Sequence, residues 1–303
     1  MKSQKTADLL LLSVAFMWGS TFVIVQNAIQ VLPPNLFNGV RFFIAAILLT
    51  LWAYRKRTFS IHKSTWIHGL FLGMFLFFGY ALQTLGLLYT SSSKAGFITG
   101  LSVLIVPILS VFLLKTKMTI FSMIGVLIGL TGLFLLTAGD FSSFTIGDIL
   151  VLLCAFAFAF HIIFTDKYSR KHRALPLTII QLVTVSLFSF FAFGLFEVNK
   201  YTVSLAMFTH FDVVLALIIT SLFATAYAFI IQTTFQPYTT ATRVALIFAM
   251  EPVFAALTAF ILIGERLTWM STMGCVLIFI AMIVSELRDV PKINPQSSKN
   301  HSV

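Results

Sequence analysis

Long apolar runs, separated by short polar loops, occupy most of the chain. A helix that spans a membrane needs about 20 mainly apolar residues, and the sequence contains ten runs close to that length. The predicted spans are residues 9–30, 36–54, 66–88, 95–114, 119–138, 147–165, 176–196, 212–235, 240–263 and 269–287. Because the loops between these runs are short, the pattern predicts an all-α integral membrane protein and leaves no room for a soluble catalytic domain.

The composition agrees with this pattern. The chain of 303 residues is 59% hydrophobic and 10% charged, with a mean hydropathy of +0.99, whereas soluble domains contain about 25% charged residues. The apolar run that begins at Leu9 continues without a small-residue cleavage site, so we expect a retained first span and not a signal peptide. Cys154 and Cys275 fall within predicted spans and are expected to be buried free thiols.

Positive charges concentrate on one side of the predicted topology. If the N-terminus is cytoplasmic and the spans alternate, only Lys94, Lys200 and Arg266 of the basic loop residues fall outside. This bias predicts a multi-pass protein of a bacterial-type plasma membrane, with both termini in the cytoplasm. The net charge of +10 therefore needs no nucleic-acid partner. Residues 291–303 are polar and are expected to form a disordered cytoplasmic tail.

The spans also indicate an internal repeat of five helices. Residues 8–26 (DLLLLSVAFMWGSTFVIVQ) align with residues 148–166 (DILVLLCAFAFAFHIIFTD), and the fourth and fifth spans align with the ninth and tenth. The alternative is that apolar segments resemble one another by composition alone. The matched positions are Asp8 with Asp148, Pro107 with Pro252, and Gly125 with Gly274.

The repeat has a consequence for orientation. The two halves, residues 1–139 and residues 140–290, each hold an odd number of predicted spans, so they would lie in opposite orientations across the membrane. Inverted repeats are typical of secondary transporters, whose substrate site lies near the midplane between the halves. The pattern therefore predicts ten transmembrane helices in two inverted five-helix repeats.

Four motifs resemble one known family. They are MWGSTFVIVQ (17–26), VRFFIAAILLTL (40–51), SSKAGFITGLSVLIVPILSVFLL (92–114) and MEPVFAALTAFILIGERLT (250–268). With these motifs, the chain resembles the EamA-type branch of the drug/metabolite transporter superfamily. The resemblance implies ten helices in two inverted repeats and the export or exchange of small polar metabolites, often amino acids, by alternating access. The first half departs from the pattern, because LLKTKMT stands where the second half has LIGERLT.

Glu251 is an acidic residue in the middle of the ninth span, beside Pro252. An ionisable side chain in a span costs about 2.5–3.5 kcal/mol on insertion scales and usually faces a cavity or a partner. Glu251 could bind an ammonium group or exchange a proton, or it could hold a fixed hydrogen bond in a structural role. The residue matched with it in the first half is Val106, so the symmetry of the fold does not require an acid.

Two further ionisable residues lie within spans. Arg41, in the second span, could hold a substrate carboxylate, or its side chain could extend to the outer interface. His161, in the sixth span, could act as a proton-linked switch or pack as a hydrogen-bonded core residue. No second His or Cys lies three or four residues from His161, so the spacing does not indicate a metal site.

Neutral polar side chains could complete a substrate pathway, since transport sites combine apolar walls with a few placed polar groups. Each could equally form an interhelical hydrogen bond worth about 0.6 kcal/mol. The candidates are Trp18, Thr21, Asn38, Tyr80, Gln83, Tyr227 and Gln232. Pro107 and Pro252 are expected to loosen their helices, and Gly125, Gly129 and Gly274 to allow close helix contacts.

These features favour a secondary transporter in a lipid bilayer, with a small-molecule substrate. The sequence lacks the GxxxxGK[ST] motif of nucleotide-driven transport, and it indicates neither a cofactor nor the residue clusters of an intramembrane enzyme. Uptake in place of export, and a membrane sensor or packing subunit without flux, are the alternatives. The sequence leaves open the substrate, the direction, coupling to protons and the oligomeric state.

Overall fold

The computed structural model describes residues 4–56, 62–90, 92–115, 119–137, 145–263 and 268–286. All regular secondary structure in these ranges is helical. In chain order the elements are α1 (Gln4–Gly19), α2 (Phe22–Val31), α3 (Pro34–Arg55), α4 (Lys63–Gly86), α5 (Ser92–Gly100), α6 (Ser102–Leu113), α7 (Ile120–Thr137), α8 (Ile146–Ser169), α9 (Ala174–Ala192), η1 (Phe193–Glu197), α10 (Leu205–Thr209), α11 (Phe211–Ile219), η2 (Thr220–Tyr227), α12 (Ala228–Phe235), η3 (Gln236–Tyr238), α13 (Ala241–Phe248), α14 (Glu251–Ile263) and α15 (Trp269–Glu286). The expectation of an all-α protein is confirmed for the described residues.

Among the described residues, eight helical segments are long and apolar enough to cross a membrane, and each coincides with a predicted span. They are Gln4–Val31, Pro34–Arg55, Lys63–Gly86, Lys94–Leu113, Ile146–Ser169, Ala174–Glu197, Phe211–Tyr238 and Ala241–Thr258. The predicted fifth and tenth spans correspond to the shorter apolar stretches Ile120–Leu135 and Trp269–Val284. Such helices extend about 24 Å, less than the roughly 30 Å hydrocarbon core, so their crossing of the membrane stays a prediction. The predicted tail, residues 291–303, lies outside the described residues.

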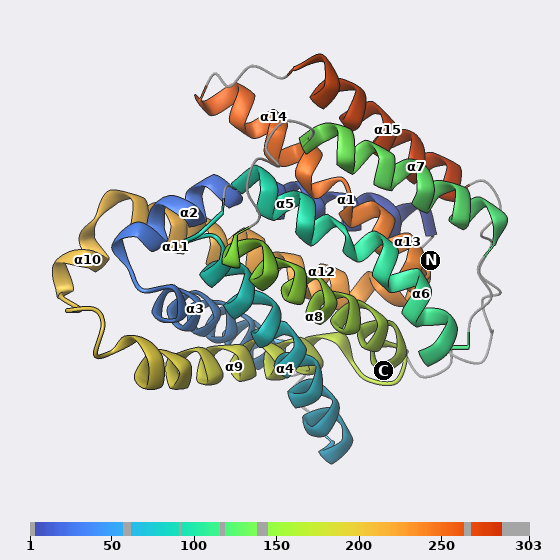
Figure 1. Ribbon diagram of the computed structural model, residues 1–303. Helices are drawn as coiled ribbons and strands as arrows, with labels where there is room; N and C mark the ends of the chain where they lie inside the picture. Colours follow the sequence, from blue (N-terminus) through green and yellow to red (C-terminus); the bar gives the residue numbers. More distant parts are fainter. Residues whose placement is uncertain are drawn as a thin grey trace.

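The two shorter helices, α7 and α15, pack side by side along one edge of the molecule (Figure 1). A Cβ atom at Gly132 would lie 2.8 Å from the carbonyl oxygen of Gly274, closer than Cβ atoms come in proteins. Gly129 faces Ala281, and Gly125 is buried. The small residues therefore let two helices of the same chain approach closely.

Three spans of the described part are interrupted near their middle. The breaks lie at Ser20 and Thr21 between α1 and α2, at Leu101 between α5 and α6, and at Ala249 and Met250 between α13 and α14. Each break contains a tight turn, in which a backbone N–H donates to the carbonyl three residues earlier. These bonds are Thr21 N to Trp18 O at 3.1 Å, Leu104 N to Leu101 O at 2.9 Å, and Met250 N to Ile247 O at 3.1 Å.

Poor helix formers flank each break. Gly19 precedes the first, Gly100 precedes the second, and Pro252 follows the third, and glycine and proline are the least favourable residues in a helix interior. Interrupted helices leave backbone N–H and C=O groups without helical partners. At membrane depth such groups are tolerated only where they are buried in protein or line a cavity.

Helix caps fix where two of the spans begin. At the start of α8, the Thr145 hydroxyl accepts from Asp148 N at 3.4 Å, and Asp148 Oδ2 accepts from Thr145 N at 2.8 Å. At the start of α13, the Thr240 hydroxyl accepts from Arg243 N at 3.3 Å.

Helix α13 packs against α1, and both begin at one end of the molecule, whereas α5 and α8 pack together and begin at the opposite end (Figure 1).

The structure shifts the expected match between Pro107 and Pro252 by one helical turn. Helices α6 and α14 begin 149 residues apart, as do α7 and α15, whereas the two prolines are 145 residues apart. Pro107 therefore lies inside α6, and Pro252 lies in the first turn of α14, where proline is tolerated because its missing N–H has no helical partner. At the spacing of these helix starts, the residue 149 positions before Glu251 is Ser102 and not Val106.

Candidate functional site

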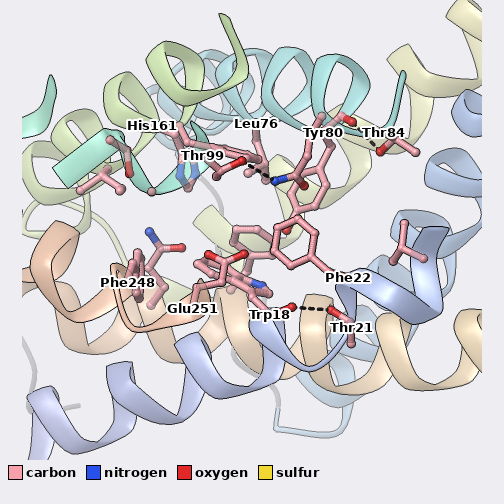
Figure 2. Close-up of a pocket in the computed structure, with 18 of the residues that line it drawn as sticks. Trp18, Thr21, Phe22, Leu76, Tyr80, Thr84, Thr99, His161, Phe248 and Glu251 are labelled. Carbon is pink, nitrogen blue, oxygen red and sulfur yellow. Dashed lines mark hydrogen bonds between the residues drawn. The ribbon is translucent and has the colours of Figure 1, made fainter. Parts of the chain in front are cut away.

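A pocket lies where the three helix breaks meet α3, α4, α8 and α12 (Figure 2). It contains about 780 Å³ of space not occupied by atoms, which includes solvent at its opening. Its polar lining residues are Trp18, Thr21, Arg41, Tyr80, Gln83, Thr84, Thr99, Ser102, His161, Gln232 and Glu251. The pocket thus gathers side chains from both halves of the chain, as a site between two repeats would.

Glu251 is the first residue of α14, and its carboxylate points into the pocket (Figure 2). The side chain is partly buried. Among the described residues, none forms a hydrogen bond or an ion pair with this carboxylate, so the alternative of a fixed structural hydrogen bond has no donor there. A carboxylate held in a pocket without a protein partner can accept hydrogen bonds from a ligand, and it suits an ammonium group.

Arg41 reaches the pocket from α3 and is 3% exposed. Its Nε donates to the Thr225 hydroxyl at 2.6 Å, and its Nη2 donates to the carbonyl oxygen of Ala224 at 3.2 Å. The guanidinium carbon lies 4.9 Å from the centroid of the Tyr80 ring, a cation–π contact. The alternative that Arg41 extends to the outer interface is wrong, because these partners on η2 hold the side chain inside the bundle.

His161 also lines the pocket, from the middle of α8. Its Nε2 lies 2.8 Å from the Gln181 Oε1 and 3.4 Å from the Thr165 hydroxyl. Because an amide oxygen only accepts, the Gln181 contact assigns the proton to Nε2. His161 is therefore a hydrogen-bonded core residue, and it presents its ring to the pocket as well.

Three neutral candidates are positioned by hydrogen bonds at the pocket wall. Gln83 Nε2 donates to the Thr99 hydroxyl at 3.2 Å, and Trp18 Nε1 donates to the Ala224 carbonyl oxygen at 2.8 Å. Gln232 Nε2 donates to the Gln236 side-chain oxygen at 3.3 Å. These bonds fix rotamers that would otherwise be mobile, so the wall is organised before any ligand binds.

Two candidates lie outside the pocket. Asn38 Nδ2 donates to the Thr84 hydroxyl at 3.0 Å and is fully buried between α3 and α4. The Tyr227 hydroxyl lies 2.9 Å from the Ser13 hydroxyl, and Tyr227 does not line the pocket. Tyr227 therefore contacts α1 and lies outside the pocket, whereas Tyr80 lines it.

The structure adds pocket residues that sequence reasoning missed. Thr99 and Ser102 flank Gly100 and Leu101 at the second helix break. Hydroxyl side chains on either side of a glycine inside an apolar span were a usable signal, because a break there exposes them to the interior. Aromatic rings also form part of the wall, namely Phe22, Phe158, Phe229 and Phe248. The described residues contain no group of three His, Cys, Asp or Glu side chains placed to hold a metal ion.

Comparisons with known proteins agree with this architecture. The model of the EamA-like transporter family matches residues 5–138 and again residues 145–286. An uncharacterized transporter of Archaeoglobus fulgidus is 35% identical over 286 residues, covering 93% of this chain and 86% of the relative. The uncharacterized transporter YoaV of Bacillus subtilis is 25% identical, covering 88% and 92%. A crystal structure with 17% sequence identity superposes with a TM-score of 0.75 over 99% of this chain and all of the other, which shows a shared fold.

Proposed function

The chain belongs to the EamA-like transporter family, and we propose that it is a secondary transporter that exports or exchanges small polar metabolites by alternating access. The observation that carries the proposal is the Glu251 carboxylate, which points into a pocket at three helix breaks without a partner among the described residues. Helix breaks at membrane depth are a recurrent feature of transporter binding sites.

The architecture that we propose is ten transmembrane helices in two inverted repeats, residues 1–139 and 140–290. The equal separation of the starts of α6 and α14 and of α7 and α15 supports this arrangement. The two matches to one family model support it as well. We further propose that both termini are cytoplasmic, on the basis of the positive charges in the loops.

The pocket chemistry favours a substrate with a positively charged group and several hydrogen-bonding atoms. Glu251 would pair with the charged group, the ring of Trp18 would lie beside it, and Gln83 and Gln232 would bind neutral polar atoms. Amino acids fit this description, with the ammonium group at Glu251. The pairing of a desolvated ammonium with a carboxylate is worth more in a pocket than in water because the local dielectric is low.

The test is flux through the purified protein in sealed liposomes. The liposomes are loaded with a panel of amino acids and other small polar metabolites, and efflux and uptake are measured with and without a pH gradient. We expect flux of at least one cationic or zwitterionic compound, and a loss of about tenfold or more in Glu251→Gln, the size of effect that one charged contact supplies. Asp212→Asn is the control, because Asp212 is a half-exposed acid at the start of α11, outside the pocket.

Each alternative has its own outcome. Flux into liposomes alone would favour an uptake carrier. The absence of flux for every compound would favour a sensor or packing subunit. Full flux in Glu251→Gln would remove the carboxylate from the mechanism and leave the family assignment intact.

A further inference from the structure

Two buried ion pairs link distant parts of the chain. Asp8 Oδ2 accepts from Arg243 Nη2 at 2.7 Å, and the side chains are 10% and 7% exposed. Lys94 Nζ lies 2.7 Å from Asp148 Oδ2, and these side chains are 8% and 0% exposed. The sequence pattern counts Lys94 among the basic loop residues, whereas the structure places Lys94 and Arg243 in the first turns of α5 and α13, where both are buried.

The two ion pairs join corresponding positions in the two halves of the chain. Asp8 and Asp148 are equivalent positions in the first helices of the two halves, α1 and α8. Lys94 and Arg243 are 149 residues apart, the separation that also relates the starts of α6 and α14. Each acid pairs with the base of the other half, so both contacts join the two halves and neither lies within one.

The pairs lie at opposite ends of the molecule, on either side of the pocket. Helices α1 and α13 begin at one end, and α5 and α8 begin at the other (Figure 1). Asp8 precedes the pocket residue Trp18 by ten residues, and Lys94 precedes the pocket residue Thr99 by five. At 1.5 Å per residue these spacings are about 15 Å and 7.5 Å of helix, so each pair lies at least one helical turn from the pocket along its helix.

A buried ion pair of this kind can form and separate reversibly, because it adds little net stability to the fold. The cost of desolvating two charges offsets most of their attraction, and apolar residues of similar size often stabilise a fold equally well. When water enters, each separated charge regains its hydration, so the pair can open at small net cost. Removal of one partner while the site stays dry is costly by contrast, because it leaves an uncompensated buried charge.

We propose that the Asp8–Arg243 and Lys94–Asp148 pairs are the two closing contacts, or gates, of the transport pathway, and that they open in alternation. The proposal rests on the proposed alternating-access function and names the side chains that close each end. Both pairs are formed in this structure, and each would restrict access to the pocket from its own face of the membrane. Opening of Asp8–Arg243 exposes it to the face that carries the N-terminus, and opening of Lys94–Asp148 exposes it to the other face.

The test uses a reporter cysteine and no substrate. Ser102→Cys places a thiol in the pocket wall of a chain that also carries Cys154→Ala and Cys275→Ala. A charged, membrane-impermeant maleimide is added to right-side-out and to inverted vesicles, and the labelling rate is measured for each. The gate variants are Asp8→Asn and Asp148→Asn, the control is Asp212→Asn, and the rescue variant exchanges the charges of one gate, Asp8→Arg with Arg243→Asp.

We expect Asp8→Asn to raise labelling by about tenfold from the cytoplasmic face only, which corresponds to about 1.4 kcal/mol in the gate equilibrium. Asp148→Asn should raise it from the outer face only. The charge exchange should restore parental labelling, and it keeps the test decisive if Asp8→Asn does not fold. Equal labelling of parent and gate variants would overturn the proposal, as would equal increases from both faces, which indicate general loosening. Side-specific shifts in a protein that moves no compound in the liposome panel would uphold the gates and refute the proposed transport.

Discussion

The backbone of Gly19, at the end of α1, lies directly against the backbone carbonyl oxygen of Glu251, at the start of α14. A Cβ atom at Gly19 would overlap that oxygen and would also lie 2.9 Å from Phe254 Cβ. Two helix breaks that are more than 200 residues apart in the sequence therefore meet without an intervening side chain. This contact sets the position of the first turn of α14, and with it the position of the Glu251 carboxylate.

Gly19→Ala should lower stability and flux together. The added methyl group would push α1 away from α14, and overpacking of this kind costs about 1–3 kcal/mol. The measurement is thermal unfolding in detergent, with liposome flux alongside. Gly194→Ala is the matched control, since nothing lies within 4 Å of a Cβ atom there, and a normal melting temperature in Gly19→Ala would contradict the close approach.

Two glutamates in the same fold should respond differently to replacement by glutamine. Glu197 is buried and accepts from Asn35 Nδ2 at 2.7 Å and from Asn35 N at 3.1 Å. Glu197→Gln would weaken these charge-assisted bonds at the start of α3 and should cost about 1–3 kcal/mol of stability. Glu251→Gln should leave stability unchanged or raised, because no described residue depends on that carboxylate. Comparable losses in both variants would indicate a structural partner for Glu251.

Arg41→Gln should destabilise the protein by roughly 2–4 kcal/mol, because the Thr225 hydroxyl and the Ala224 carbonyl oxygen would lose bonds from a charged donor. Arg41→Lys keeps the charge and loses the planar, forked donor geometry, so it should recover only part of the loss. Denaturant titration of the three proteins tests the order. An Arg41→Gln variant as stable as the parent would mean that the side chain extends to the interface.

His172 should make the end of the bundle between α8 and α9 sensitive to acid. Its Nε2 lies 2.6 Å from His68 Nδ1, and burial, with the charges of His68 and Lys171, lowers the pKa of His172 below its ordinary value of 6.5. The unfolded chain therefore binds a proton at a higher pH than the folded chain does, so this contribution to stability is complete above about pH 6.5 and is lost as the pH falls below it.

The measurement is the melting temperature between pH 5 and pH 8 for the parent and for His172→Gln. The variant should show less of the decline in melting temperature on the acid side, and it should differ most from the parent near pH 8, where the contribution of His172 is complete. Parallel curves over the whole range would show that His172 does not contribute to the acid sensitivity.

Much of this architecture is determined by the sequence alone. Apolar runs of about 20 residues can satisfy their backbone groups in a bilayer only as helices, so the spans and the all-α class can be predicted from the order of the residues alone. The family motifs can be recognised in the same way. The position of Glu251 inside a span was readable in the same way, and eight of the ten candidate pathway residues line the pocket.

Only the tertiary structure shows which side chains contact one another across helices. Arg243 and Asp8 are 235 residues apart, and no local pattern distinguishes a base in a buried interhelical pair from a base in a solvated loop. The same limit applies to Arg41, whose partners lie more than 180 residues away, and to Tyr227, whose hydroxyl lies beside that of Ser13 on α1 and outside the pocket. Hydrophobic periodicity reports which segments are helical, whereas the pairing of side chains depends on how those helices dock, and that docking is settled by close packing between segments that are remote in the chain.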